Sequence, residues 1–483
     1  MKRQRIGLVV GVVLFCLFAF VPIPGLPESA GKMLAVAILM AAWWVSEAIP
    51  LAATALLPLV LFPTMGLASA SRTAAPYANH LIFLFMGGFM LAQAMQRWNL
   101  HRRIALRIVG LIGTNPAQLI LGFMCATAFL SMWVSNTATV AMMMPIGMAV
   151  TKQVAEAIAE RDFGIDVTPG RFHFGIDLML GIAYAASIGG VGSLIGTPPN
   201  VLLAGVLEES YGIELSFLGW MAFGVPFVAL LLPLTWLWLT RFAYPLEIPE
   251  VPGGRRLIRE QLEALGPMGD GERKTAVVFV LTAAAWMFRP LWTTWLPSGE
   301  LITDSTIAIA SALLLFLLPT GSGDRVLDWH WASRLPWEVL VLFGGGFALA
   351  NGFEMSGLSQ WVGELLVSLK EAPLPVFIIA IVILLMVLTE FASNTASAAM
   401  ALPILGAAAI AMGLSPLILC VPAAVAASCA FMMPAATPPN AIVFGTGYFT
   451  IPQMVRAGAF VVLTAGVLIS VFTLLLLRPI FGV

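Results

Sequence analysis

The chain has 483 residues, of which 60% are hydrophobic and 10% are charged, and its formal net charge is −1. A soluble domain usually carries about 25% charged residues, so this composition argues against a soluble enzyme. It also argues against a nucleic-acid partner, because no basic cluster is joined to a soluble domain. Runs of about 20 apolar residues recur along the chain, each long enough to cross about 30 Å of hydrocarbon. We therefore expect an all-α polytopic membrane protein in contact with lipid.

The N-terminal segment MKRQRIGLVVGVVLFCLFAFVPIPG resembles a signal peptide, because basic residues precede an apolar run. The apolar run is about 18 residues long, which exceeds a usual signal-peptide core, and no clear A-x-A cleavage site follows. We interpret it as a retained first helix. Four cysteines lie in apolar stretches without a C-x-x-C pair, which predicts core residues rather than a disulfide framework or a metal cage: Cys16, Cys125, Cys420 and Cys429.

Hydropathy predicts about eleven spanning helices. They lie near residues 6–23, 31–49, 50–66, 80–98, 176–208, 217–240, 275–292, 303–319, 337–355, 416–447 and 457–478.

Two further apolar segments, near 117–153 and 374–412, are each interrupted by Ser-Asn-Thr. If each segment re-enters and leaves the membrane on one side, most of the 24 Lys and Arg residues fall on the side of the N-terminus. Cytoplasmic loops carry an excess of Lys and Arg. We therefore expect two re-entrant helical hairpins, a cytoplasmic N-terminus and an extracytoplasmic C-terminus. Compact loops and the retained first helix favour the cell inner (plasma) membrane.

The chain contains an internal repeat. LFMGGFMLA (84–92) matches LFGGGFALA (342–350) at an offset of 258 positions, and Ser135 and Ser393 are also 258 positions apart. GTPPN (196–200) and ATPPN (436–440) are 240 positions apart, so the first copy carries extra residues, assigned to EAIAERDFGIDVTPGRF. The expected topology gives the two copies opposite orientations. Inverted-topology repeats are typical of secondary transporters whose binding site lies near the bilayer midplane, where broken helices meet.

Each Thr-Pro-Pro-Asn motif is expected to break its helix. Proline lacks the N–H group and clashes with the preceding turn, and the residue before it avoids helical angles. The fifth and tenth spans should therefore each consist of two half-helices, with free carbonyl groups at Gly196 and Ala436. Ser-Asn-Thr is a favourable N-cap composition and suits the tip of a helical hairpin.

These motifs offer ligands for a cation and an anion together. Hydroxyl, amide and backbone oxygens are hard neutral ligands, and without carboxylates they suit Na⁺ better than Ca²⁺. The N–H groups at half-helix N-termini attract anions. We expect no Lys or Arg near either motif, so helix ends and bound cations would have to supply the positive charge. This arrangement predicts coupled transport of a cation and an anion.

The paired Ser-Asn-Thr motifs, the paired TPPN motifs and WWVSEAIPL (43–51) resemble the divalent anion/sodium symporter family, which includes sodium-coupled dicarboxylate transporters. The resemblance spans nearly the whole chain and implies two or more sodium sites. The first site would use Ser131, Ser135 and Asn136 with the backbone oxygen of Gly196. The second would use Thr389, Ser393 and Asn394 with the backbone oxygen of Ala436. The substrate's carboxylates would meet Asn136, Thr137, Asn394 and Thr395, beside Thr197, Thr437 and Pro438.

The resemblance also implies a homodimer, in which each protomer has a fixed scaffold and a transport domain that moves like an elevator. By this analogy residues 1–110 and 275–370 are scaffold, and residues 111–240 and 371–483 belong to the transport domain. Residues 241–274 form a cytoplasmic linker, in which GGRRLIREQLEALG suggests a surface amphipathic helix.

Glu390 is an acidic residue in an apolar segment, three positions before Ser393. Acidic residues at membrane depth are functional candidates by default. Glu390 either anchors the hairpin by accepting hydrogen bonds from backbone N–H groups or handles an ion or a proton directly.

Several functions remain open at this stage. The favoured function is Na⁺-coupled symport of C4-dicarboxylates such as succinate, malate or fumarate. A sodium-independent dicarboxylate exchanger of the same fold would use the same groups, and citrate or sulfate would be recognised by the same neutral donors. A membrane-embedded enzyme would need a nucleophile, paired carboxylates or a metal cluster, and the sequence indicates none. Inverted broken helices also suit alternating access better than an open channel.

Overall fold

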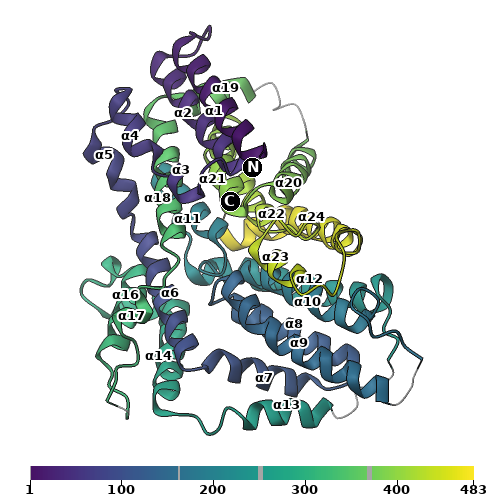
Figure 1. The fold of residues 1–483 in the computed structure, drawn as a ribbon. Coiled ribbons are helices and arrows are strands. Elements are labelled where there is room, and N and C mark those ends of the chain that lie inside the picture. Colours follow the sequence, from purple (N-terminus) through teal and green to yellow (C-terminus); the bar gives the residue numbers. More distant parts are fainter. Residues whose placement is uncertain (1, 161–163, 249–253, 322, 367–372, 483) are drawn as a thin grey trace.

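The computed structural model describes residues 2–160, 164–248, 254–321, 323–366 and 373–482, and most of them are helical (Figure 1). Within these ranges the one extended pairing is an isolated bridge between Pro319 and Arg325. The expected all-α fold is confirmed.

The first half of the chain runs from α1 to the linker helix α13. Its helices are α1 (Lys2–Phe20), α2 (Glu28–Ser46), α3 (Leu51–Thr54), α4 (Leu57–Thr64), α5 (Ala70–Ala74), the 3₁₀ helix η1 (Ala75–Ala78), α6 (His80–Arg97), α7 (Leu100–Ile112), α8 (Pro116–Ser131), α9 (Asn136–Glu160), α10 (His173–Gly190), α11 (Pro198–Tyr211), α12 (Phe217–Trp238), the π-helix η2 (Leu239–Ala243) and α13 (Gly254–Glu263).

The second half runs from α14 to α24. Its helices are α14 (Asp270–Met287), α15 (Arg289–Trp292), the 3₁₀ helices η3 (Thr293–Trp295) and η4 (Gly299–Leu301), α16 (Asp304–Leu317), α17 (Trp329–Ala332), α18 (Trp337–Met355), α19 (Leu358–Leu366), α20 (Leu374–Phe391), α21 (Asn394–Ala411), α22 (Pro416–Ala427), α23 (Pro438–Phe444) and α24 (Ile451–Phe481).

By length and composition, 8 helices of the described ranges can cross a membrane, or up to 9 if the bent pair at α14 and α15 counts as one span. Three of the four shorter apolar helices, Leu51–Thr64, Asp304–Leu317 and Pro416–Ala427, fall on further expected spans, and the fourth, Pro116–Ser131, falls on the first expected hairpin. The multi-pass character is therefore confirmed, while the count of eleven spans stays a prediction. Helix α1 covers most of the first apolar run, and the expected linker helix coincides with α13.

The helices pack as two groups. We call α1–α6 with α14–α18 the frame group, in which α6 packs on α16 and α18 packs on α3. We call α8–α12 with α20–α24 the hairpin group, in which α10 contacts α8, α9 and α23, and α12 contacts α24. Figure 1 shows α8, α9, α10 and α12 side by side, apart from α6, α14 and α16. The two groups meet chiefly where α18 contacts α11 and α21.

Two amphipathic helices connect the groups at equivalent places in the repeat. Helix α7 starts at Leu100 and α19 starts at Leu358, which are 258 positions apart. The residues before them, Asn99 and Gly357, both have positive φ angles, of 55° and 78°. Helix α7 packs on α8 and α19 packs on α21. Each hairpin is therefore joined to the frame group through a helix that also packs along it.

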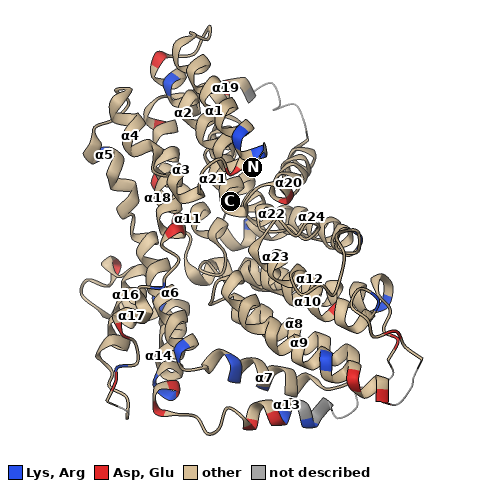
Figure 2. Ribbon diagram, in the orientation of Figure 1, with Lys and Arg blue, Asp and Glu red and all other residues tan. Residues whose placement is uncertain are grey.

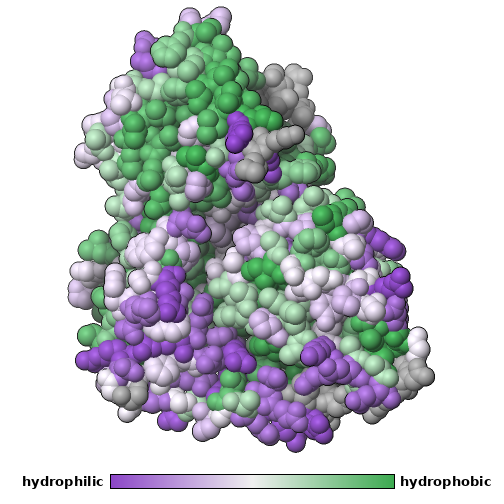
Figure 3. All heavy atoms as spheres, in the orientation of Figure 1, coloured by the Kyte–Doolittle hydropathy of each residue, from purple (hydrophilic) through white to green (hydrophobic). Residues whose placement is uncertain are grey.

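Charged residues avoid most of the helical body. Figure 2 shows them gathered on α7, on α13 and near the end of α9. Figure 3 shows apolar residues covering much of the upper part of the same face, over α1 and α2, and hydrophilic residues along its lower edge. Among the described residues, one charged pair has both partners buried: Arg103 of α7 contacts Glu272 of α14, with Nη2 3.0 Å from Oε2. This pair ties α7 to the frame group.

One expectation about the cysteines is wrong. Cys420 and Cys429 are buried, whereas Cys16 is exposed and Cys125 is partly exposed. Cys16 lies on α1, which contacts little besides α2 and leaves most of its surface uncovered. An apolar stretch in a membrane protein need not face the protein interior, because lipid covers it equally well.

Candidate functional site

The first hairpin consists of α8 and α9, joined by residues 132–135. The Ser135 hydroxyl accepts a hydrogen bond from the Ala138 N–H group at 3.4 Å, so Ser135 caps α9 as its composition predicts. The tip therefore presents the N-terminus of a 25-residue helix, where the first N–H groups lack helical partners. Asn136 is the first residue of this helix.

Oxygen atoms converge at this tip. Ser131 Oγ is fully buried and lies 2.6 Å from Asn136 Oδ1 and 2.8 Å from the carbonyl oxygen of Ala186 on α10. A hydroxyl carries one proton, so Ser131 can donate to only one of these two oxygens. The expected partnership of Ser131 with Asn136 is present in the structure.

The Asn136 amide has two chemically different orientations. Its inward atom lies 2.6 Å from Ser131 Oγ and 3.2 Å from the carbonyl oxygens of Ala186 and Gly196. With nitrogen inward, the two N–H groups of the amide can donate to two of these three acceptors. With oxygen inward, four oxygens face one another, and the Ser131 hydroxyl supplies the one proton among them. The cluster made by Ser131, Asn136, Ala186 and Gly196 thus has the donor set of a hard-cation site.

The second hairpin repeats this arrangement. Thr389 Oγ1 is fully buried and lies 2.6 Å from Asn394 Oδ1 and 2.7 Å from the carbonyl oxygen of Ala427, the last residue of α22. Ser393 precedes α21 but makes no side-chain capping hydrogen bond, so the capping expectation is wrong for this serine. Asn394, which opens α21, takes the place that Asn136 has in the first cluster.

Both expected helix breaks are present. Helix α10 ends at Gly190 and α11 begins at Pro198, while α22 ends at Ala427 and α23 begins at Pro438. The stretches 191–197 and 428–437 between them lie against the hairpin tips. In one such contact, the Ser193 hydroxyl donates to the carbonyl oxygen of Met132.

The asparagines of the two TPPN motifs hold these stretches in place. Asn200 Nδ2 donates to the carbonyl oxygens of Gly190 and Ser193, at 3.2 and 2.7 Å. Asn440 Nδ2 donates to those of Ala430 and Met433, at 3.2 and 3.1 Å. Both amide oxygens are buried and have no hydrogen-bond partner among the described residues. A buried acceptor of this kind favours a nearby donor or cation.

Glu390 binds the backbone of the second break. Its Oε1 accepts hydrogen bonds from the N–H groups of Phe431 and Met432, at 2.8 and 3.0 Å. Its Oε2 accepts from those of Met432 and Met433, at 3.2 and 3.0 Å. The side chain is buried. The structure therefore gives Glu390 the anchoring contacts that we expected as one of its two alternatives.

The remaining expected site residues differ in exposure. Thr197, Thr395 and Thr437 are buried, whereas Thr137 and Pro438 are exposed. The Thr437 hydroxyl accepts from the Asn440 N–H group at 3.3 Å and caps α23, but Thr197 makes no such bond to α11. Of the two expected backbone ligands, Gly196 has its carbonyl oxygen in a cluster, 3.2 Å from the inward atom of the Asn136 amide. The role of the Ala436 oxygen stays a prediction.

The expectation that no basic residue lies near either motif is wrong. Arg3 of α1 donates from Nη2 to the carbonyl oxygen of Phe391, at 2.6 Å, and also contacts the carbonyl oxygen of Val45. Phe391 ends α20, two residues before Ser393. The sequence could not indicate this contact, because it joins positions 388 residues apart.

Sequence reasoning also missed the carbonyls of Ala186 and Ala427 and the amides of Asn200 and Asn440. Any residue type can supply a carbonyl oxygen, so the first two leave no signal in the sequence. The two asparagines do leave one, since both occupy the last position of a motif repeated at an offset of 240.

The chain is similar over its whole length to a known family and its members. A family model described as the sodium:sulfate symporter transmembrane region matches residues 2–482. The chain is 44% identical over 485 residues to the sodium-dependent dicarboxylate transporter SdcS of Staphylococcus saprophyticus, a match that covers 99% of this chain and 92% of that protein. It is 43% identical to SdcS of Staphylococcus aureus (strain USA300), with the same coverage.

Two solved structures have a similar fold. The YdaH transporter of Alcanivorax borkumensis superposes with a TM-score of 0.56 at 12% identity, covering 98% of this chain and 96% of that chain. MtrF of Neisseria gonorrhoeae gives a TM-score of 0.57 at 12% identity, covering 94% and 96%. At this identity the likeness shows the fold alone.

Proposed function

The chain belongs to the sodium:sulfate symporter family, and on that premise we propose that it is a secondary active transporter that carries C4-dicarboxylates such as succinate, malate and fumarate into the cell together with Na⁺. The two SdcS relatives are named sodium-dependent dicarboxylate transporters. The observation that carries the proposal is the pair of equivalent oxygen clusters, one at each hairpin tip.

Each cluster would hold one Na⁺. The ligands are the Ser131 or Thr389 hydroxyl, the Asn136 or Asn394 amide oxygen and nearby backbone carbonyls. All are neutral and hard. Ser135 and Ser393 stand at the same tips and would complete the coordination, as would the carbonyl oxygens of Gly196 and Ala436.

The anion would bind between the helix N-termini. The sequence has no Lys or Arg in residues 108–151, 172–240 or 371–455, which contain both hairpin tips and both broken helices. The positive ends of α9 and α21, with their free N–H groups, would attract the substrate's carboxylates. Asn136, Thr137, Asn394 and Thr395 would donate to the carboxylates, and Thr197, Thr437 and Pro438 would line the cavity.

The two orientations of the Asn136 amide give a physical basis for coupling. When Na⁺ occupies the first cluster, the amide oxygen faces the cation and the nitrogen turns away from it, free to donate to a carboxylate. Without Na⁺ the nitrogen would donate to two of the three acceptors Ser131, Ala186 and Gly196, and the amide oxygen, now turned outward, would repel an anion. On this proposal, cation binding replaces the amide oxygen that faces the substrate with the amide N–H groups, which can donate hydrogen bonds to its carboxylate.

Alternating access would come from movement of the hairpin group past the frame group, as in an elevator. On this proposal residues 1–110 and 275–370 form the scaffold, and residues 111–240 and 371–483 move with the substrate. The linker 241–274 crosses the cytoplasmic side, the N-terminus is cytoplasmic and the C-terminus is extracytoplasmic. Two protomers would form a homodimer in the cell inner (plasma) membrane, so that the scaffold stays fixed while each hairpin group moves.

Uptake of labelled succinate into proteoliposomes tests the proposal. With potassium alone inside, we expect accumulation that requires an inward Na⁺ gradient. Sodium-indifferent uptake that requires internal dicarboxylate would instead establish an exchanger, with the Ser-Asn-Thr groups serving the anion alone. If succinate is not taken up under either condition, citrate and sulfate are the substrates to test next, because they would be recognised by the same neutral donors.

Substitution of Gly190 should damage the first cluster by steric contact. A Cβ atom at this position would lie 2.5 Å from Asn136 Oδ1. We expect Gly190→Ala to displace the amide and to lower the initial rate of succinate uptake by about 100-fold, the scale of a 1 Å misplacement. The measurement is uptake per amount of incorporated protein.

Gly31→Ala is the matched control for this substitution, because a Cβ atom there meets no atom closer than 3.7 Å. Gly31 lies inside α2, where alanine is a better helix former, so its uptake should be unchanged. Wild-type uptake by Gly190→Ala would show that the amide position is not critical.

A further inference from the structure

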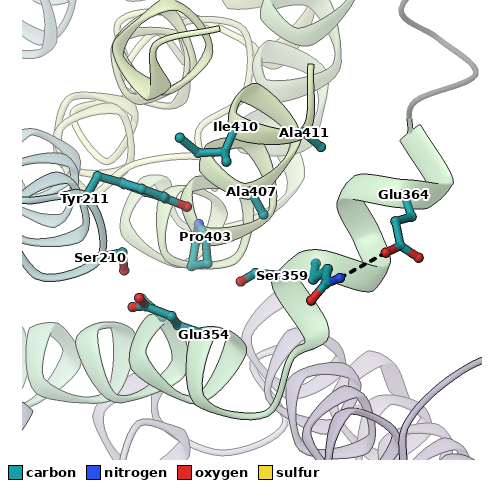
Figure 4. Close-up of a pocket in the computed structure, with 11 residues that line it drawn as sticks. Ser210, Tyr211, Glu354, Ser359, Glu364, Pro403, Ala407, Ile410 and Ala411 are labelled. Carbon is teal, nitrogen blue, oxygen red and sulfur yellow. Dashed lines mark hydrogen bonds between the residues drawn. The ribbon is translucent and has the colours of Figure 1, made fainter. Parts of the chain in front are cut away.

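A cavity of about 400 Å³ lies outside the candidate site, at the contact between the two helix groups (Figure 4). Its walls come from the end of α11 and from α21 in the hairpin group, and from α18 and α19 on the other side. None of its lining residues belongs to a Ser-Asn-Thr or TPPN motif. Its lining on α21 begins at Pro403, nine residues beyond Asn394, which places it roughly 14 Å or more along the helix axis from that tip. The cavity is therefore separate from the proposed transport site.

The chemistry of the lining indicates the class of ligand. Pro403, Ala407 and Ile410 supply apolar surface, and Figure 4 shows the ring of Tyr211 reaching toward Pro403 and Ala407. Glu354 and Glu364 supply two carboxylates, and the described lining contains no Lys, Arg or His. An apolar body with one positive charge complements such a lining, since a cation is attracted to carboxylates and also to an aromatic face. The volume is within the range of small-molecule sites.

The internal repeat supplies a comparison within the same chain. At an offset of 258, Glu354 corresponds to Gln96, Gln360 to Arg102 and Glu364 to Leu106. The equivalent place in the first half therefore has no carboxylate at these positions and carries a positive charge. Since the two halves share one architecture, the acidic lining is not a requirement of the fold. It is a property of this cavity.

We propose that this cavity binds a monovalent organic cation with an apolar body and that the bound cation inhibits transport without competing with substrate. The inhibition rests on the proposed function. A ligand that contacts α11 and α21 on one side and α18 and α19 on the other stabilises the arrangement in which these walls face each other. A ligand shifts an equilibrium only by its differential affinity for the two states. Movement of the hairpin group would separate the walls, so the ligand opposes movement in either direction.

The binding is tested with benzyltrimethylammonium, a permanently charged aromatic cation, on the detergent-solubilised full chain. A ligand that binds the folded state raises the thermal unfolding midpoint in a concentration-dependent way. We expect this rise for the wild type and for Glu338→Gln, which changes an exposed glutamate at the other end of α18. We expect at least about tenfold weaker binding, and loss of the rise, in Glu354→Gln and Glu364→Gln, because each removes a carboxylate charge that attracts the quaternary ammonium. The uncharged 2-methyl-1-phenyl-2-propanol should give no rise.

The inhibition is tested by succinate uptake into proteoliposomes with the same compound. We expect a lower maximal rate at an unchanged KM for succinate, and normal uptake without the compound in both glutamine variants. Inhibition that succinate relieves would overturn the proposal, because it would place the cation in the transport site. A rise in unfolding midpoint that is equal in the wild type and both glutamine variants would overturn the site itself. The unfolding measurement does not depend on transport, so it tests cation binding in the cavity even if the proposed function is wrong.

Discussion

Asn136→Ala is expected to lower Na⁺-driven succinate uptake by about 100-fold, because it removes a cation ligand and an anion donor together. A hydrogen bond to a charged group alone contributes about 1.5–3 kcal/mol, which corresponds to a factor of about 10 to 100. Asn394→Ala should have a similar effect, since Asn394 has the same place in the second cluster, 2.6 Å from Thr389 Oγ1. The measurement is the initial rate of labelled succinate uptake as a function of Na⁺ concentration. Near-normal transport by both variants would contradict the site assignment.

Two further variants separate this effect from loss of folding. Asn115→Ala removes the cap of α8 at the opposite end of the same hairpin, where the Asn115 side chain accepts from the Gln118 N–H group. It should cost about 1 kcal/mol of stability and leave the Na⁺ dependence unchanged. Asn136→Asp keeps an oxygen for the cation but has no N–H to donate. Asn136→Asp should therefore retain Na⁺-dependent thermal stabilisation and lose succinate uptake. Asn136→Ala cannot separate these two roles, because it removes the cation ligand and the anion donor together.

Glu390→Gln is expected to weaken the apparent Na⁺ affinity for uptake by at least about tenfold, because hydrogen bonds to a charged acceptor contribute about 1.5–3 kcal/mol each. Glutamine keeps one acceptor oxygen and places an amide NH₂ against backbone N–H groups, so contacts with residues 431–433 are lost. The stretch 428–437 would then no longer be held against the tip of the second hairpin. The measurements are the Na⁺ dependence of uptake and the thermal unfolding midpoint.

Met132→Leu is the matched control for Glu390→Gln, since Met132 stands 258 positions before Glu390 in the first repeat. A swap between leucine and methionine conserves volume and is usually tolerated, so its Na⁺ dependence should match that of the wild type. A glutamine variant with wild-type Na⁺ affinity and wild-type unfolding midpoint would show that the anchoring contacts are dispensable.

The parts of the fold that sequence could predict are those that local chemistry decides. Proline at positions 198 and 438 breaks its helix wherever the chain lies, and the breaks occur as expected. Ser131 and Thr389 precede the tip asparagines by five positions, which brings each pair together across the turn between two helices. Repetition of these motifs at fixed offsets then predicted two equivalent clusters.

The parts that sequence could not predict depend on contacts between distant segments. The approach of Arg3 to Phe391 joins the first helix to the second hairpin, and nothing in either segment indicates it. The carbonyl oxygens of Ala186 and Ala427 join the clusters because of where α10 and α22 pass, not because of their side chains. The missing cap at Ser393 shows that the same tripeptide can make different local bonds in the two halves.

The two halves also fasten their tips by opposite means. In the first half the hydrogen-bonding side chain belongs to the break, where Ser193 donates to the backbone of Met132. In the second half it belongs to the hairpin, where Glu390 accepts from the backbone of residues 431–433, and the position equivalent to Ser193 is Met433. A chimera assembled from two copies of the first half would therefore lack the acidic anchor, and one assembled from two second halves would bury an additional carboxylate in the membrane. Each fastening lies within its own half, so the two tips are held independently and by different chemistry.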